Sequence, residues 1–343
     1  MIDGHGNDLS LYGDRVRIDF SSNIAFNNHS AAILAHLKGK LPAVLNYPDP
    51  KASTLRTLIA HHHGVKPANV LVTNGSAEAF YVAAHWLRGE DVRSLIFVPS
   101  FAEYEDSCNA HGHRVDFLPL SDFDRADYAA YRSVWVGFPN NPDGRRVPLT
   151  QIESLAHRCP HCYFVVDAAY DELSASSEAK RMDCLPPNLL LVHSLTKTFG
   201  IPGLRIGYLL AEGSIVEQME RLKTPWSVNA LALKAGEYIM THYEDLAANK
   251  AELLAESIRL QRNVAAIAGF HVVPSDCNFF LCELTNGHTA AELHRYLLEQ
   301  HGILIRNASN FRGLTDRHFR LAVQANVANN QLLNALKQWT TIL

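Results

Sequence analysis

Residues 193–208, with the sequence HSLTKTFGIPGLRIGY, decide how this chain folds and what its centre holds. The segment places one lysine, Lys197, among hydroxyls, glycines and an arginine, directly after the apolar run 188–193. A second apolar run follows at 204–211, so both flanks are expected to be buried strands and the lysine lies in the loop between them. A lysine held in such a pocket loses proton affinity and becomes an amine nucleophile. The segment therefore predicts a lysine that forms a Schiff base with pyridoxal phosphate, whereas a solvated surface lysine is the alternative that these residues alone leave open.

Two places in the chain are expected to hold the phosphate of such a cofactor. Around the lysine, Ser194 and Thr196 supply hydroxyls, and Arg205 supplies a planar, permanently charged fork that matches a phosphate. Earlier in the chain, the apolar strand expected at 70–73 runs through a glycine turn at 74–76 into an apolar-periodic helix. The N-terminus of a helix binds phosphate through its free backbone amides and its dipole.

Composition indicates a globular enzyme with a full core. The chain has 343 residues, of which 47% are hydrophobic, and its net charge is only -4. No block of like charges occurs, so neither nucleic acid nor a membrane is expected as a partner. The N-terminus has no basic start or apolar run, and no stretch reaches about 18 consecutive apolar residues, which predicts a cytoplasmic protein. The six scattered cysteines agree with reduced thiols.

Alternating apolar and helical stretches from 70 to 211 predict an α/β fold with a mostly parallel central sheet covered by helices. The expected strands are 70–73, 94–98, 114–118, 133–138, 163–167, 189–193 and 204–210. After Pro225 the pattern changes to helices from 227 to about 268, followed by strands at 278–284, 303–306 and 319–323 and a last helix from 326 to 343. We therefore expect three parts: an N-terminal arm belonging to the small domain (1–30), a large cofactor-binding domain (31–226) and a small α+β domain (227–343).

Several loops at strand ends carry candidate ring contacts. Asp167 ends an apolar strand and is placed to keep a pyridine nitrogen protonated, although a helix-capping acid is the alternative. Tyr170 adds a phenol near the same edge. Asn141, in the turn 138–144, is a candidate for the ring hydroxyl, and Phe101 is a candidate for stacking on the ring. Taken singly, the first is a turn residue and the second a core residue.

Two further clusters are expected to be structural. Cys159 and Cys162 have the spacing of a redox or metal pair, but they lie between a helix and a strand, not at a helix N-terminus. His61, His62 and His63 are consecutive on a helix, where neighbouring side chains point in different directions. We expect a solvated helix end there, and no metal site in the protein.

Together, these motifs resemble the aspartate aminotransferase superfamily of pyridoxal phosphate enzymes, fold type I, and the match spans nearly the whole chain in the family's order. The resemblance implies Lys197 as the Schiff-base lysine, Asp167 on the ring nitrogen, Asn141 and Tyr170 on the ring oxygen, and Phe101 on the ring face. It also implies the remaining contacts: Ser76, Ala77, Ser194, Thr196 and Arg205 on the cofactor phosphate, Tyr47 on the phosphate of the neighbouring subunit of a homodimer, Arg320 on the substrate α-carboxylate and Asn23 near that carboxylate.

Within this superfamily, the chain is most similar to the threonine-phosphate decarboxylases of cobalamin biosynthesis and, next, to the histidinol-phosphate aminotransferases. The segments that carry this similarity are 5–7, 19–24, 100–104, 201–205, 225–231 and 302–311. By this resemblance, His5 and Arg306 bind the phosphate of a phosphorylated amino-acid substrate, which requires cationic donors. The chain departs from the family pattern at Asp143, where threonine is usual, and in having a single glycine after His5.

The resemblance implies the decarboxylation of L-threonine O-3-phosphate to (R)-1-amino-2-propanol phosphate and carbon dioxide, with Lys197, Asp167 and Tyr170 as the catalytic groups. The alternatives are an aminotransferase acting on histidinol phosphate or another amino acid, and a binding protein that keeps the fold without the chemistry. The residues alone do not decide between loss of the carboxylate and loss of the α-hydrogen.

Overall fold

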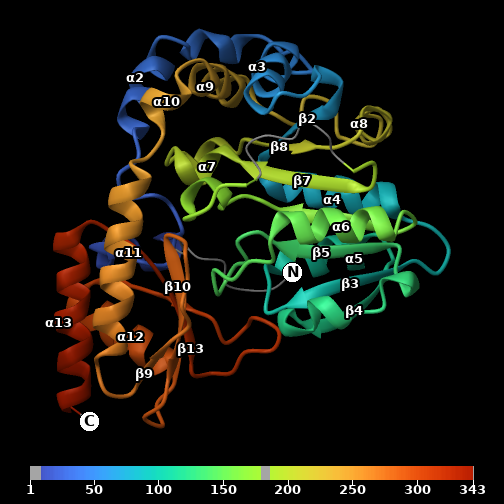
Figure 1. Ribbon diagram of the computed structural model, residues 1–343. Coiled ribbons are helices and arrows are strands. Elements are labelled where there is room, and N and C mark those ends of the chain that lie inside the picture. The colour runs from blue at the N-terminus through green and yellow to red at the C-terminus, as the bar shows by residue number, and fades with distance from the viewer. Residues whose placement is uncertain (1–8, 179–185, 343) are drawn as a thin grey trace.

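A seven-stranded sheet forms the centre of the molecule in the computed structural model, which describes residues 9–178 and 186–342 (Figure 1). Its strand order is β2-β8-β7-β6-β5-β3-β4. Strands β3 to β7 are parallel, and β8 is antiparallel to both of its neighbours. The strands are β2 (Val70–Thr73), β3 (Arg93–Val98), β4 (Arg114–Pro119), β5 (Ser133–Gly137), β6 (Tyr163–Asp167), β7 (Leu189–Ser194) and β8 (Gly207–Leu210). The prediction of a mostly parallel central sheet is confirmed.

Helices cover both faces of this sheet because its inner strands are apolar on both sides. Along β5, Trp135 packs with helices on one face, and its neighbours Val134 and Val136 pack with helices on the other. The first face is covered by α4 (Gly75–Leu87), α5 (Ala102–Ala110) and α8 (Gly213–Glu220). The second is covered by α2 (Ser30–Lys38), α3 (Ser53–His63), α6 (Leu149–Arg158) and α9 (Ala230–Thr241).

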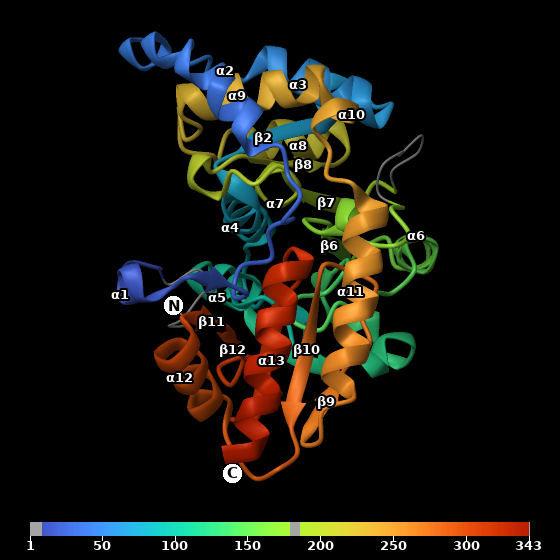
Figure 2. The same cartoon turned by 90° about the vertical axis from the view of Figure 1, so that its left-hand side faces the viewer.

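A smaller unit lies at one side of the large sheet (Figures 1 and 2). It contains an antiparallel sheet of order β12-β13-β10-β9 and three helices. The strands are β9 (Phe270–Val272), β10 (Phe279–Leu284), β12 (Arg306–Asn307) and β13 (His318–Ala322), and the helices are α11 (Lys250–Ala265), α12 (Ala290–His301) and α13 (Asn326–Ile342). The short helices α1 (Leu9–Tyr12), α7 (Leu195–Thr198) and α10 (Tyr243–Leu246) complete the main elements.

The N-terminal segment joins the small unit through a two-stranded parallel sheet. Here β1 (Ile18–Asp19) pairs with β11 (Ile303–Leu304). The strand expected at 303–306 is therefore two strands, because β11 pairs with β1 whereas β12 pairs with β13. The strand expected at 204–210 begins only at Gly207, since Arg205 takes a left-handed conformation with φ 57°.

Helix α9 packs on α2 and α3 in the large unit. Its Ala232, Leu233 and Ile239 share a core with Leu55 and Ile59 of α3. The expected domain boundary after residue 226 would place α9 in the small domain, whereas the helices that bury α9 belong to the large unit. The long helical stretch expected from 227 is broken into α9, α10 and α11.

The expectation of a solvated helix end at 61–63 is wrong for His63. His61 is exposed, but His63 is only 1% exposed and its Nε2 lies 2.8 Å from the Tyr208 hydroxyl. The ring of His193 stacks on Tyr208 with 4.9 Å between the ring centroids. Because consecutive helical residues point in different directions, one of the three histidines faces the sheet and is buried there.

Within residues 9–178 and 186–342, no helix is both long and apolar enough to cross a membrane.

Candidate active site

One cavity gathers most of the predicted site residues. Strands β6 and β7 deliver their carboxyl ends to it, and the small unit contributes residues on its other side. The predicted residues that line it are Asn23, Ala77, Phe101, Asn141, Tyr170, Lys197, Arg205, Arg306 and Arg320. Ligands of open α/β sheets bind at this position, outside the carboxyl ends of the strands.

Lys197 lies in α7, which follows β7 directly. Ser194 caps this helix, because its hydroxyl accepts a hydrogen bond from the Thr196 amide at 3.3 Å. The pKa of Lys197 is lowered to about 8, chiefly by burial and in addition by the nearby charges of Arg320 and Arg205, while Asp167 opposes the shift. About a tenth of the amine is therefore neutral and nucleophilic at pH 7, far more than for a lysine with the ordinary pKa.

Asp167 ends β6, is 5% exposed and is not itself one of the residues that line the cavity. The Tyr104 hydroxyl donates to its Oδ2 at 2.6 Å, and the Ala169 amide donates to its Oδ1 at 3.0 Å. Burial raises the pKa of Asp167 to about 6, and the bond from Tyr104 works against that rise. Tyr104 was not among the residues predicted for the site; the signal that could have found it is its place three residues after Phe101, one helical turn along α5.

The phosphate cradle is built by α4 and Arg205. Helix α4 begins at Gly75, whose φ is 75°, and a Cβ added there would lie 2.5 Å from Arg205 Nη2. Strand β8 approaches equally closely, because a Cβ on Gly207 would lie 2.8 Å from the Ser76 amide nitrogen. The guanidinium and the first amides of a thirteen-residue helix thus meet at one point. Such an arrangement favours an anion.

The hydroxyls of Ser194 and Thr196, also predicted for the phosphate, contact each other. They are 2.8 Å from each other, both residues are buried, and neither lines the cavity. Ser76, which was also predicted, is the second residue of α4, and its backbone amide belongs to the start of that helix.

Two arginines enter the cavity from the small unit. Arg320 of β13 is 4% exposed and donates to the Asn141 side-chain oxygen and, at 2.6 Å, to the Ser21 carbonyl. Burial lowers the pKa of Arg320 to about 10. Arg306 of β12 donates to the Asn307 carbonyl at 2.6 Å and to the Asn310 side-chain oxygen at 2.9 Å. The cavity can therefore receive two anionic groups besides a cofactor phosphate.

The residues present fit pyridoxal phosphate. Lys197 supplies an amine of lowered pKa for the aldehyde, and Asp167 supplies a carboxyl for the ring nitrogen. Arg205 and the start of α4 supply a cationic cradle for the phosphate. Phe101 and Tyr170 add aromatic walls to the same cavity.

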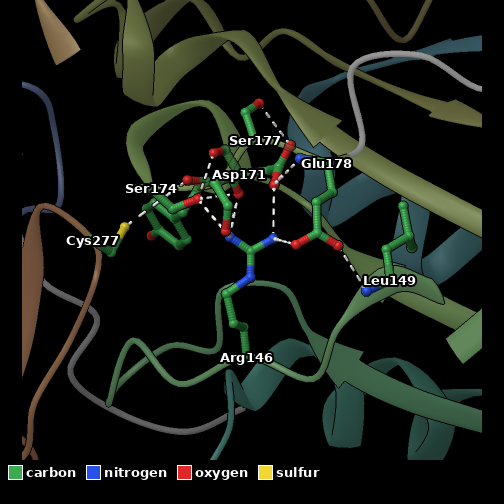
Figure 3. Close-up of polar contacts among 9 residues, drawn as sticks. Arg146, Leu149, Asp171, Ser174, Ser177, Glu178 and Cys277 are labelled. Carbon is green, nitrogen blue, oxygen red and sulfur yellow. Dashed lines mark hydrogen bonds and ion pairs between the residues drawn. The ribbon is translucent and has the colours of Figure 1, made fainter. Parts of the chain in front are cut away.

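A buried ionic network supports the loops that carry Asn141 and Tyr170 (Figure 3). The Arg146 side chain is 11% exposed and lies 4.3 Å from the centroid of the Phe138 ring. Its Nη2 is 3.1 Å from Glu178 and 3.5 Å from Asp171, and its Nη1 donates to Ser174 at 3.1 Å. Arg146, which follows the turn 138–144, therefore ties that turn to the loop after Tyr170, and this role was not predicted from the sequence.

The unusual Asp143 also serves the turn that holds Asn141. Its carboxylate accepts from Asn140 Nδ2 at 2.7 Å and from the Arg145 amide at 3.1 Å. Aspartate thus satisfies this tight turn in place of the family's usual threonine.

The predicted residue Tyr47 does not line this cavity either. Tyr47 is 85% exposed and packs against Trp226, with 5.3 Å between ring centroids. His5 lies outside the described residues. Their roles stay predictions. Among the described cysteines, Cys159 and Cys162 are both free, and no group of three or more possible metal ligands occurs in the described part of the chain.

Comparison with known proteins gives consistent matches over nearly the whole length. The family model described as aminotransferase class I and II matches residues 17–338. The threonine-phosphate decarboxylase of Salmonella typhimurium is 30% identical over 340 residues, covering 94% of this chain and 91% of that protein. The histidinol-phosphate aminotransferase of Caldanaerobacter subterraneus subsp. tengcongensis is 32% identical over 303 residues, covering 85% of this chain and 84% of that protein.

Among solved structures, the L-threonine-O-3-phosphate decarboxylase of Porphyromonas gingivalis superimposes with a TM-score of 0.88 at 36% identity. The match covers 94% of this chain and 99% of that one.

Proposed function

The chain belongs to the class I and II aminotransferase family of pyridoxal phosphate-dependent enzymes, and within that family we propose that it decarboxylates L-threonine O-3-phosphate. The products are (R)-1-amino-2-propanol phosphate and carbon dioxide. The reaction is a step of cobalamin biosynthesis. Relatives with either the decarboxylase or the histidinol-phosphate aminotransferase name are similarly close in identity, so the choice between them rests on the cavity.

The pair of arginines from the small unit carries this proposal. Threonine phosphate has two anionic groups, an α-carboxylate and a phosphomonoester, and Arg320 and Arg306 provide one buried guanidinium for each. Histidinol phosphate has a phosphate but no carboxylate. A glutamate used by an aminotransferase also has two anionic groups, however, and so the assay must separate the two reactions.

The remaining residues have roles that follow from their positions. Pyridoxal phosphate, once bound, supplies the electron sink for the bond that breaks. Asp167 holds a proton at the ring nitrogen, and Tyr104 fixes the orientation of that carboxyl. With a pKa of about 8, Lys197 can both take up and return a proton near neutral pH.

Arg320 orients the substrate by its carboxylate, with Asn23 beside it in the cavity. Phe101 packs on the cofactor ring. Asn141 and Tyr170 hydrogen-bond the oxygen on that ring. The cofactor phosphate is bound by Arg205, Ser76, Ala77, Ser194 and Thr196. Arg306 binds the substrate phosphate together with His5.

A homodimer in the cytoplasm is part of the same proposal. Exposed apolar side chains gather around Tyr47, and patches of this kind mark sites of protein association. They are Leu41, Val44, Leu45, Tyr47 and Trp226. In such a dimer Tyr47 reaches the cofactor phosphate of the neighbouring subunit. The described cysteines are free, which agrees with a reducing compartment.

Product analysis tests the reaction. Purified holoenzyme is incubated with L-threonine O-3-phosphate, with and without 2-oxoglutarate, and carbon dioxide and glutamate are measured. Carbon dioxide release that does not require 2-oxoglutarate supports the proposal. Glutamate formation that requires an amino donor such as histidinol phosphate would instead identify an aminotransferase.

The substrate phosphate site is tested by Arg306→Ala. We expect selective loss of affinity for phosphorylated substrates, while the visible absorbance of the lysine-bound cofactor is kept. If affinity and absorbance are both unchanged, Arg306 does not bind the phosphate.

A further inference from the structure

The connection between β12 and β13, residues 308–317, crosses from the small unit to the large one. Its Arg312 donates to Glu105 through two bonds, from Nη2 to Oε1 at 2.6 Å and from Nε to Oε2 at 3.0 Å. The same guanidinium lies 4.1 Å from the centroid of the Phe117 ring. Glu105 belongs to α5 and Phe117 to β4, and all three residues line the cavity. Bidentate geometry of this kind fixes direction as well as distance.

The crossing segment is also the support of Arg306. The Arg306 guanidinium donates to the Asn307 carbonyl and to the Asn310 side chain, and it lies 5.2 Å from the centroid of the Phe311 ring. The next residue in the chain is Arg312. The position of Arg306 over the cavity is therefore coupled to the place where Arg312 is anchored.

The anchor on the other side is a helix of the cofactor site. Helix α5 begins directly after Phe101 and carries Tyr104, the partner of Asp167, immediately before Glu105. One ion pair thus links the turn that supports Arg306 to the helix that supports the cofactor ring.

We propose that Glu105 and Arg312 form a latch that positions Arg306 for phosphorylated substrates. Glu105 takes up the two donors of Arg312 in a bidentate ion pair. Arg312 therefore acts on the substrate indirectly, by holding the connection 308–317 in place. Both are positioning residues. The inference rests on the proposed function in one respect, the assignment of Arg306 to the substrate phosphate.

The test uses holoenzyme with Glu105→Gln, Arg312→Gln and the double variant. Dissociation constants of L-threonine O-3-phosphate and of L-threonine are measured by rapid mixing before turnover, from the change in cofactor absorbance. We expect each single variant to bind the phosphorylated ligand about two- to fivefold more weakly, the effect typical of one exposed ion pair. L-Threonine affinity and cofactor absorbance stay unchanged, and the double variant is no weaker than either single one, because both substitutions remove the same pair. The difference from wild type shrinks at high salt.

The pair Glu283–Arg317 offers a matched control, because it joins the last residue of the connection to β10 of the same small unit and does not anchor the connection to α5. It joins the same two side-chain types at 2.8 Å, with exposures of 26% and 49% against 19% and 50% for the latch, and it lies outside the cavity lining. Glu283→Gln and Arg317→Gln are expected to leave the affinity for both ligands unchanged.

Three outcomes would overturn the latch. If Glu105→Gln tightens phosphate binding while Arg312→Gln weakens it, Arg312 is itself a phosphate ligand. If both variants weaken L-threonine as much as its phosphate ester, the pair has only a general structural role. If both bind like wild type while Arg306→Ala weakens the phosphorylated ligand, the latch fails and the proposed phosphate site stands. Failure of Arg306→Ala itself instead refutes the phosphate site.

Discussion

Asp167 and Lys197 show how burial sets the chemistry of single residues. The pKa of the Asp167 carboxyl rises to about 6 and that of the Lys197 amine falls to about 8, so both pKa values move toward pH 7 from opposite sides. In both cases desolvation is the main cause, because each side chain is removed from water at the edge of the sheet. A buried acid with a raised pKa lowers the free energy of unfolding of the cofactor-free protein at a pH where the acid is ionised.

We expect Asp167→Asn to stabilise the cofactor-free protein at pH 8. The pKa of Asp167 rises from 3.8 to about 6 on folding, so the ionised form opposes folding above pH 6 and this penalty disappears as the pH falls toward 3.8. A difference of about two pKa units corresponds to at most about 3 kcal/mol. Urea denaturation at pH 8 and at pH 5 measures the gain, which should be smaller at pH 5. A gain that does not depend on pH would contradict this origin.

Residue roles were predictable where a motif singles out a side chain, and less so where a contact spans the fold. Lys197, Asp167 and Arg205 stand out because each follows or precedes an apolar strand. Tyr104 and Arg146 do not, because their importance comes from partners 63 and 32 residues away in the chain. Local sequence does not reveal the partner in such pairs, although the place of Tyr104 one helical turn after Phe101 is a signal for Tyr104 itself.

At the level of elements, Gly75 decides how closely α4 and Arg205 approach. We expect Gly75→Ala to weaken pyridoxal phosphate binding about tenfold, because alanine is strained at a positive φ and its methyl group displaces the guanidinium. The dissociation constant of the cofactor, followed by absorbance, measures the loss.

Gly213→Ala is the matched control for this substitution. Gly213 also begins a helix, α8, but its φ is not positive and its nearest neighbour to an added Cβ is 3.5 Å away. Cofactor affinity should stay as in wild type. Equal losses in the two variants would show that the methyl group does not act through Arg205.

The Arg146 network makes a stability prediction for the loop after β6. We expect Arg146→Met to reduce the free energy of unfolding by about 3 kcal/mol, because it removes the Arg146 guanidinium from beside the buried Asp171 carboxylate. The neighbouring Arg145→Met serves as control, since the Arg145 side chain is 54% exposed and 3.8 Å from its acidic partner. Urea denaturation of both variants tests the difference. A loss below about 1 kcal/mol for Arg146→Met would mean that Asp171 is satisfied without it.

Most elements were predictable from periodicity, and the exceptions have physical causes. The run 303–306 is continuous as a pattern, but alternation does not reveal the partner strand, and two sheets divide it. The histidines at the end of α3 are polar in the sequence, yet Tyr208 offers His63 a hydrogen bond inside the core. Tertiary partners decided both cases.

For the whole molecule, the apolar patch around Tyr47 makes a prediction about assembly. We expect Leu45→Glu, which puts a charge on a side chain that is 82% exposed, to convert the proposed dimer into a monomer of 38.2 kDa and to weaken cofactor binding. Sedimentation at micromolar concentration measures the mass. Val327→Glu is the control, because Val327 is 71% exposed on α13, outside the patch, and should leave the dimer intact. A wild-type protein that sediments as a monomer would refute the dimer.

The pairing of β1 with β11 also governs when the molecule can become complete. Ile18 is paired with Ile303, so the first strand leaves the ribosome long before its partner exists. At about 5–20 residues per second, the delay is roughly a quarter of a minute to one minute. The central sheet, which lies between these two segments of chain, can form during that time. The N-terminal strand is therefore expected to dock late, after the central sheet has folded and together with the other C-terminal elements of the small unit.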